Sequence, residues 1–122
     1  MHIIKYDNKA HRIDITLSGV ISFEEAEEIK EKIIKDTEEL TPGFDVVNNI
    51  SKFIQGDEKA GAIIQEIINY FISKGVKRIV RVVGTSKTGL LQFAKFTQEH
   101  ENVTFHYFPT LEVARDFLEK NS

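Results

Sequence analysis

Four predicted β-strands begin at nearly regular intervals, and this spacing constrains the fold more than any other feature of the sequence. The strands begin near residues 12, 44, 77 and 103, and a helical pattern fills each interval between them. Two parallel strands need a crossover connection of about a dozen residues or more, usually a helix. The spacing therefore predicts successive strand-helix-strand units with parallel strands and right-handed crossovers.

The first two strands form a different pattern. His2 to Asp7 is predicted as a short strand, and Asn8-Lys9 supplies a turn into a strand that begins at Arg12. From Arg12 to Ser18 apolar and polar residues alternate, which is typical of a strand with one face toward water. The chain is therefore expected to start with an antiparallel hairpin.

The first two predicted helices have clear start and stop signals. Ser22 and Glu25 have capping-box spacing, so a helix is predicted over residues 23–39, ending at Thr41-Pro42-Gly43. A strand over 44–50 follows, and then a loop to about Gly56. Asp57 is predicted to cap a second helix, whose broad apolar stripe indicates packing against a sheet.

The C-terminal part repeats the strand-helix pattern. Gly75 is predicted as a left-handed C-cap, and residues 78–83 are β-branched enough for a central strand. The loop 84–89 opens a third predicted helix, and a fifth strand over 103–108 leads to a last helix capped by Thr110. The order ββαβαβαβα predicts one α/β domain over residues 1–122, with a mixed, mostly parallel five-stranded sheet.

Composition excludes several classes of function. The 122 residues include 41% hydrophobic residues, a net charge of −3 and no cysteine, so one apolar core without disulfides or thiolate metal sites is expected. A nucleic-acid-binding protein is expected to have a basic face, and this sequence shows none, so nucleic-acid binding is not expected. No apolar run reaches the roughly 18 residues that span a bilayer, and no signal-peptide pattern opens the sequence, so a cytoplasmic protein is expected.

The glycine-led segment Gly43–Ile50 and the segment Gly75–Gly84, together with the element order, resemble the STAS group of anti-sigma-factor-antagonist-like (SpoIIAA-like) domains. That group includes small stand-alone members that have also been compared with CRAL-TRIO lipid-binding proteins. The resemblance covers nearly the whole chain. It implies helices mainly on one face of the sheet and a role in regulatory protein binding or ligand sensing.

The resemblance also shows that one functional residue of the antagonists, the phosphorylated serine, has no counterpart here. In the antagonists an Asp-Ser pair follows the third strand where the second helix begins, and phosphorylation of the serine switches partner binding. This sequence has Gln55-Gly56-Asp57 at that place, and Ser51 comes several residues too early. The usual phosphoacceptor serine is therefore absent. Asp57 is interpreted mainly as a permanent N-cap worth ~1 kcal/mol, with a standing negative charge that imitates phosphoserine as the alternative.

The predicted binding residues lie where strands lead into helices. Backbone amides at a helix start attract anions, and Lys87 adds a positive charge, although the spacing matches neither a Walker loop nor a dinucleotide fingerprint. A partner or a small anion is therefore expected at two loops, 49–57 and 84–89, with a plain capping role as the alternative. The candidate residues are Asn49, Gln55, Gly56, Asp57, Arg81, Gly84, Thr85, Ser86, Lys87 and Thr88.

Arg78 and Arg81 are expected on opposite faces of their strand. Arg81 is the charge expected to be partly buried, and Asp45 or Asn49 on the adjacent strand is a candidate for pairing with it. A structural ion pair is favoured over an anion-binding arginine.

The apolar residues raise two further questions. A pocket for a lipid-like molecule is an alternative use of the broad second helix, around Ile63, Ile67 and Phe71. Apolar residues wrap around the third predicted helix, from Leu90 to Phe96, which fits an exposed patch for a partner or homodimer as well as a helix sunk between other elements.

Catalytic signatures are not found. The histidines at 2, 11, 100 and 106 lack metal-site spacing, and neither a nucleophile motif nor a distinct carboxylate pair occurs. We therefore predict no cofactor, no metal and no catalytic residue. The leading hypothesis is a non-enzymatic regulatory or protein-interaction module, and the alternative is a carrier or sensor of a small amphipathic or anionic ligand. An enzyme is the third hypothesis.

Overall fold

The computed structural model describes residues 1–56, 58–84 and 103–121, and it forms one sheet with helices on both faces. The strands are β1 (His2–Asp7), β2 (Arg12–Ile21), β3 (Asp45–Gly56), β4 (Arg78–Val82) and β5 (Thr104–Phe108). The helices are α1 (Phe23–Asp36), α2 (Glu58–Ser73) and α4 (Leu111–Lys120).

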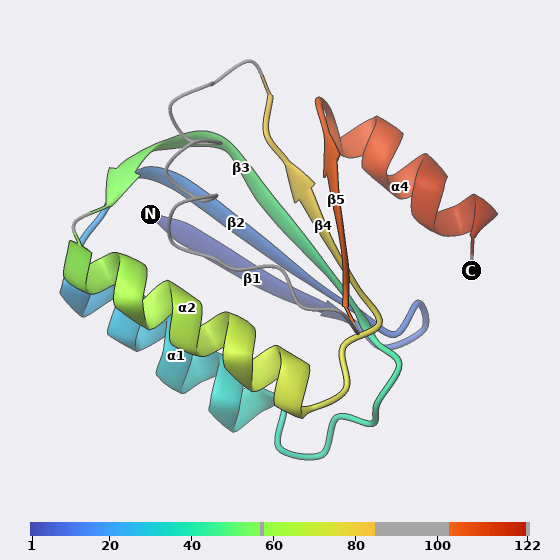
Figure 1. Cartoon of the computed structure of the whole chain (residues 1–122), viewed down its shortest axis with the longest axis horizontal. Helices are drawn as coiled ribbons and strands as arrows, with labels where there is room; N and C mark the ends of the chain where they lie inside the picture. The colour runs from blue at the N-terminus through green and yellow to red at the C-terminus, as the bar shows by residue number, and fades with distance from the viewer. Residues whose placement is uncertain (57, 85–102, 122) are drawn as a thin grey trace.

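The strand order in the five-stranded sheet is β1-β2-β3-β4-β5, the same as the order along the chain (Figure 1). β1 pairs antiparallel with β2, while β2, β3, β4 and β5 are mutually parallel. The prediction of a mixed, mostly parallel sheet is therefore confirmed.

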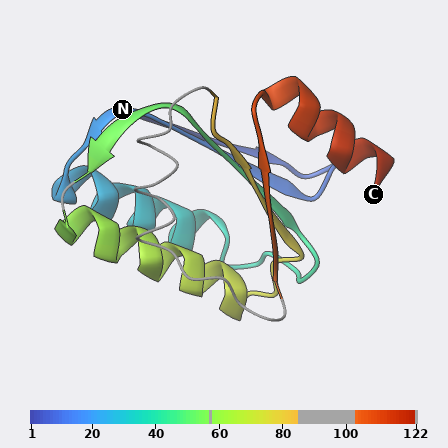
Figure 2. The same ribbon diagram turned by 45° about the horizontal axis from the view of Figure 1, so that its top comes forward.

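The helices α1 and α2 cover one face of the sheet, and α4 lies on the other face against β4 and β5 (Figure 2). Right-handed crossovers that always step in the same direction along a sheet place their helices on the same face. Since α4 follows β5 and leads to no described strand, this constraint does not apply to it.

The core is divided by the sheet. The larger apolar cluster joins the inner face of the sheet to α1 and α2 and includes Ile33, Phe53 and Phe71. The smaller cluster joins Val47, Val80 and Val82 to Ala114 and Leu118 of α4. Every residue of β4 is buried, as expected for a strand covered on both faces.

The predicted caps are confirmed where the structure describes them. Ser22 and Thr110 accept hydrogen bonds from the backbone amides of Glu25 and Val113. Gly75 has φ +90°, and a Cβ there would lie 2.7 Å from the Cβ of Pro42, so this turn requires glycine. Helix α1 ends at Asp36 rather than near residue 39, and at its C-cap the Thr37 hydroxyl donates to the Ile33 carbonyl and is hydrogen-bonded to Tyr70.

One predicted boundary is wrong. Residues 51–56, expected as a loop, continue β3 as far as Gly56. Ser51 and Lys52 look like turn residues in the sequence, but the pairing with β2 is maintained by register shifts between Thr16 and Ser18 and between Gly19 and Val20. Such bulges absorb extra residues without ending a strand.

The third predicted helix, including Leu90 to Phe96, lies outside the described residues, as does Asp57. None of the helices that are described is both long and apolar enough to cross a bilayer.

Candidate functional site

The carboxyl ends of β2 and β3 form a bent, two-stranded extension beside the starts of α1 and α2 (Figure 1). The two register shifts fall in this extension, and Gly19 there has φ +69°. Bulges increase local twist and often re-aim side chains next to functional sites. In open α/β sheets ligands bind outside the carboxyl ends of the strands, so this extension is the first candidate binding surface.

Two aliphatic side chains on the extension point into solvent. Val20 is 55% exposed and Ile54 is 60% exposed. Gly19 pairs with Phe53 and Val20 pairs with Gln55, so Ile54 is the extra residue opposite them. The exposed residues Lys52 and Ser22 lie nearby along the two strands. We call Val20, Ile54 and Lys52 the ribbon-tip patch.

Asn49 and Gly84, two of the predicted residues, are brought together at this edge by Ser51. The Oδ1 atom of Asn49 accepts hydrogen bonds from the Ser51 amide at 3.1 Å and from its hydroxyl at 2.7 Å. Gly84 has φ +60°, and a Cβ there would lie 2.9 Å from the Cβ of Ser51. The end of β4 therefore touches β3 closely, and this contact requires a glycine.

The other predicted carboxyl-edge residues are placed only in part. The backbones of Gln55 and Gly56 belong to the end of β3, where they pair with Val20 and Ile21. Asp57, Thr85, Ser86, Lys87 and Thr88 lie outside the described residues. Their predicted role in binding a partner or an anion stays a prediction.

Arg81 does not join this group. It is 1% exposed and lies on the α1–α2 side of the sheet, where its guanidinium is 5.0 Å from the Phe105 ring centre and donates to the Tyr107 hydroxyl at 3.0 Å. The expectation that it would be buried is correct, but the expected pairing with Asp45 or Asn49 is wrong. Both candidates lie on the opposite face of the sheet, because side chains alternate along β3 and β4.

Asp45 pairs instead with Arg78. The Arg78 Nε and Nη2 atoms donate to the two carboxylate oxygens at 2.9 and 2.8 Å, and Nη1 donates to the Asn121 carbonyl at 3.0 Å. The hydrogen bond and charge of Asp45 raise the pKa of Arg78, against the effect of burial. The pair joins β3, β4 and the end of α4 and has a structural role.

The described residues of the sheet, α1 and α2 line a small apolar cavity. Its volume is about 30 Å³, and Ile67 and Phe71 line it, whereas Ile63 is half-buried and does not. Among its apolar walls Asn48 is 7% exposed, and its Oδ1 accepts no hydrogen bond from any described residue. This volume is far below the several hundred Å³ of a typical small-molecule site.

A second hollow of about 140 Å³ lies on the other face of the sheet, beside the start of α4. Lys5, Asp14 and Asn49 line it together with Arg115 of α4. Burial raises the pKa of Asp14, although Arg12 and Arg115 act in the opposite direction. This mixed-charge hollow could hold a small polar molecule. The sequence did not reveal it, because neither the hairpin register nor the position of α4 is readable from spacing.

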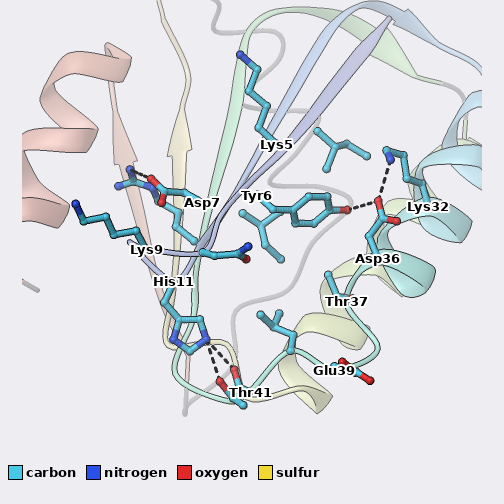
Figure 3. A pocket seen from close by; sticks show the side chains of 15 residues that line it. Lys5, Tyr6, Asp7, Lys9, His11, Lys32, Asp36, Thr37, Glu39 and Thr41 are labelled. Carbon is cyan, nitrogen blue, oxygen red and sulfur yellow. Dashed lines mark hydrogen bonds and ion pairs between the residues drawn. The ribbon is translucent and has the colours of Figure 1, made fainter.

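A groove of about 1230 Å³ lies between β1 and the C-terminal half of α1 (Figure 3). At its centre Tyr6 donates to Asp36 at 3.0 Å, and Lys32 donates to the same carboxylate oxygen at 2.8 Å. These two hydrogen bonds lower the pKa of Asp36. Burial, followed by the Asp36 hydrogen bond, raises the pKa of Tyr6. At one end, the His11 ring contacts the Thr41 carbonyl at 3.0 Å.

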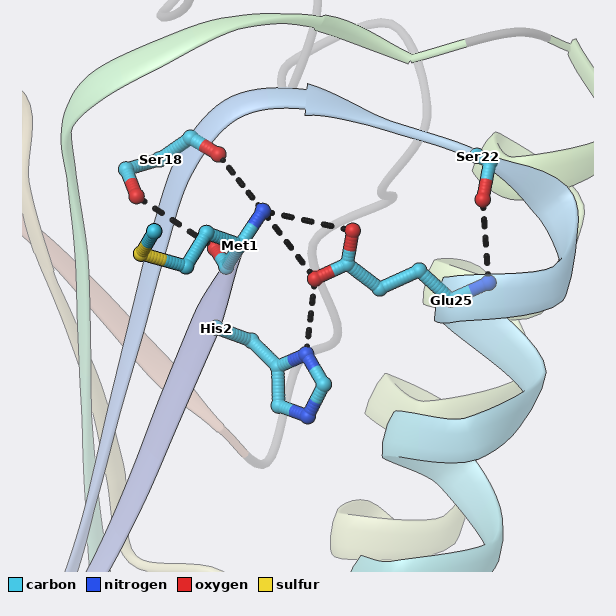
Figure 4. A network of polar contacts seen from close by, with 5 residues as sticks. All are labelled: Met1, His2, Ser18, Ser22 and Glu25. Carbon is cyan, nitrogen blue, oxygen red and sulfur yellow. Dashed lines mark hydrogen bonds and ion pairs between the residues drawn. The ribbon is translucent and has the colours of Figure 1, made fainter.

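A polar network ties the start of β1 to the start of α1 (Figure 4). The Nδ1 atom of His2 lies 2.7 Å from Glu25, and the amine of Met1 lies 3.1 Å from the same carboxylate oxygen. Partial burial alone would raise the pKa of Glu25, but these hydrogen bonds and charges outweigh it and lower the pKa. β1 is thereby attached to α1 at both ends, through Glu25 and through Asp36.

These surfaces suit binding. In the described ranges, no three histidine, aspartate or glutamate side chains come together in a way that could hold a metal ion. An exposed aliphatic pair and a polar groove, both formed by described residues, are the kinds of surface feature through which proteins contact other molecules.

Comparison with known proteins identifies the fold. The arrangement is a SpoIIAA-like α/β fold. It is similar to the crystal structure of an uncharacterized DUF3478-family protein from Shewanella loihica PV-4, described as having a SpoIIAA-like fold. The TM-score is 0.70 at 16% sequence identity, over 97% of this chain and 92% of that one. No family model and no curated protein matches the sequence.

Proposed function

We propose that this SpoIIAA-like chain is a non-enzymatic protein-interaction module that binds a protein partner through the ribbon-tip patch. The observation that carries the proposal is the exposure of Val20 and Ile54, at 55% and 60%, on the paired ends of β2 and β3 in a bulged extension of the sheet. Specific protein interfaces commonly have an apolar centre inside a polar rim, and Lys52 and Ser22 supply polar neighbours here.

The cavity volume argues against the alternative carrier function. A carrier of a lipid-like molecule needs an apolar chamber, whereas the apolar cavity that the described residues line between the sheet and α1 and α2 has a volume of about 30 Å³. A module that acts through its surface has no need of such a chamber. The proposal therefore assigns the apolar helix face around Ile67 and Phe71 to the core.

Control of binding would differ from that of the antagonists that the sequence resembles. The phosphoacceptor serine is missing, and the Ser51 hydroxyl is half-buried and bound to Asn49. We infer that this chain binds its partner constitutively at the carboxyl edge, with Asp57 as a fixed charge or cap. Regulation would then come from the amount of protein or from the partner.

The test compares partner capture by three forms of the tagged protein from extracts of the native host, with bound proteins quantified by mass spectrometry. The double variant Val20→Asp/Ile54→Asp is expected to capture at least ten times less partner than the control Val113→Asp. The control changes a 45% exposed residue on α4. Melting temperatures show whether each variant is folded. Equal capture by the double variant and the control would refute the assignment of this patch.

A further inference from the structure

Among the strands that the structure describes, the outer side of β1 is a free edge of the sheet. β1 is the first strand in the sheet order, and only its inner side pairs with β2. Proline residues and β-bulges commonly block edge-to-edge pairing of strands. None of the six residues of β1 is proline, and its pairing with β2 has no register shift. Ile3 in this strand is 50% exposed.

The hydrogen bonds between β1 and β2 show which backbone groups point outward. The Met1 amine donates to the Ser18 carbonyl, and the Ser18 amide donates to the Met1 carbonyl. In an antiparallel pair, residues that bond to the neighbour alternate with residues whose N–H and C=O point away. The outward-pointing groups of β1 therefore belong to His2, Ile4 and Tyr6.

This set is symmetric about Ile4. If a second β1 pairs antiparallel with the first and Ile4 faces the partner's Ile4, then His2 faces the partner's Tyr6. In this register every outward N–H and C=O group meets its complement across the new pair. Lys5 faces the partner's Ile3, so like charges do not lie directly opposite each other.

The helix α1 adds a complementary charge pattern along the same edge. Glu25 contacts His2 at the start of β1, and Asp36 contacts Tyr6 at its end, so α1 and β1 run in the same direction. The first turns of α1 are rich in glutamate, including Glu24 and Glu28, and the last turns carry Lys32 and Lys35. A two-fold axis through Ile4 would place the acidic half of each α1 beside the basic half of the other.

We propose that the protein forms a symmetric dimer in which β1 of one copy pairs antiparallel with β1 of a second copy, joining the two sheets edge to edge. The groove beside Tyr6 and Lys32 provides room for the start of the partner's strand and helix (Figure 3). A second copy is favoured over an unrelated peptide, because the backbone groups and the helix charges are both self-complementary about one axis.

The test is the mass in solution, measured by sedimentation equilibrium from 5 to 200 µM. The wild-type protein is expected to approach twice the chain mass of 14.0 kDa. Ile4→Pro removes an outward N–H that β2 does not use, and it should give a monomer at all these concentrations. Ile4→Val keeps that N–H and loses only one methylene, so this matched control should remain a dimer.

Hydrogen exchange of the wild-type protein gives a second, mutation-free measurement. In the proposed dimer the amides of Ile4 and Tyr6 exchange at least ten times more slowly at 200 µM than at 5 µM. A monomer with fast exchange at these amides would overturn the proposal. So would a dimer that persists in a folded Ile4→Pro variant, because its interface would then lie elsewhere. Slow exchange in a monomer would show that another segment of the chain covers β1, and this also contradicts the proposal.

Discussion

Asn48 lies in an apolar environment that does not match its chemistry. Its side chain is 7% exposed and lines the small cavity with residues of the sheet, α1 and α2. A buried carbonyl oxygen without a hydrogen bond costs about 1–3 kcal/mol. In the described part of the chain, nothing donates to Asn48 Oδ1.

We therefore predict that Asn48→Leu stabilises the protein. Leucine has nearly the same shape as asparagine, so it would remove the unpaired oxygen and fill the same space. The free energy of unfolding, measured by urea denaturation, is expected to rise by about 1 kcal/mol. The control Asn69→Leu, at an exposed position on α2, should change it by less than about 0.5 kcal/mol. A clear loss of stability in Asn48→Leu would show that the cavity holds a group that satisfies this amide.

His106 couples the stability of the α4 side to pH. Its ring centre is 4.6 Å from that of Phe117 and 6.3 Å from that of Phe108. Burial, and then the charge of Arg78, lower the pKa of His106 below the ordinary 6.5. The unfolded chain therefore takes up the proton first as the pH falls, so stability is lost below pH 6.5 and levels off below the folded-state pKa.

This predicts a difference between the wild-type protein and His106→Phe. The unfolding free energy of the wild type should fall more steeply between pH 7.5 and 5.5 than that of the variant, which keeps the ring contacts without the titrating group. Urea denaturation across this range measures both slopes. His11→Phe, which removes a histidine that lines the groove beside β1 instead, serves as a control. Parallel slopes for wild type and His106→Phe would contradict the predicted coupling.

At the scale of elements, the attachment of β4 and α4 depends on the Arg78–Asp45 pair. Both side chains are nearly buried, at 9% and 12% exposure, and the closest oxygen-nitrogen distance is 2.8 Å. Arg78 also holds the Asn121 carbonyl and lies over the Phe117 ring at 5.8 Å. One arginine thus contacts two strands and the end of a helix.

Arg78→Met is expected to destabilise the protein by about 3–5 kcal/mol, because it leaves the Asp45 carboxylate buried without its partner. The double variant Arg78→Met/Asp45→Leu should recover most of this loss, since two apolar side chains replace the ion pair. Chemical denaturation of both single variants and the double variant forms a double-mutant cycle. If the two single losses simply add in the double variant, the pair has no coupling energy and this account fails.

Elements with local signals were predictable, and those that depend on tertiary pairing were not. The Ser22 and Thr110 caps and the Gly75 turn are determined by neighbouring residues, and all three are confirmed. The end of β3 depends on bulged pairing with β2, which polar residues such as Ser51 concealed. Likewise, the partner of Arg81 could not be read from spacing, because pairing depends on which face each side chain occupies.

At the scale of the whole molecule, the fold was predictable because the strand-helix spacing leaves few topologies open. The surfaces were harder to predict. The exposed pair Val20 and Ile54, the groove at Tyr6 and the hollow at Asp14 each combine residues from different elements. Their formation depends on the register of the hairpin, on two bulges and on the face that α4 occupies.

The whole-molecule prediction is that the purified protein carries no lipid-like molecule. The cavity of about 30 Å³ has room for a water-sized or methyl-sized group and not for an acyl chain. Native mass spectrometry of protein purified without detergent should show the mass of the polypeptide alone or of its dimer. Delipidation with organic solvent, followed by refolding, is expected to leave the melting temperature unchanged. A co-purified amphipath that raises the melting temperature would favour the carrier function.

The order of the strands also affects how the molecule can be built. Each strand lies beside the one that preceded it in the chain, from β1 through to β5. During synthesis the N-terminal hairpin can therefore act as a template, and each strand that emerges later finds its neighbour already in place. None of the described strands has to insert between two strands that are already paired. The sheet can therefore assemble in the direction of translation, and α4 packs on its second face after β5.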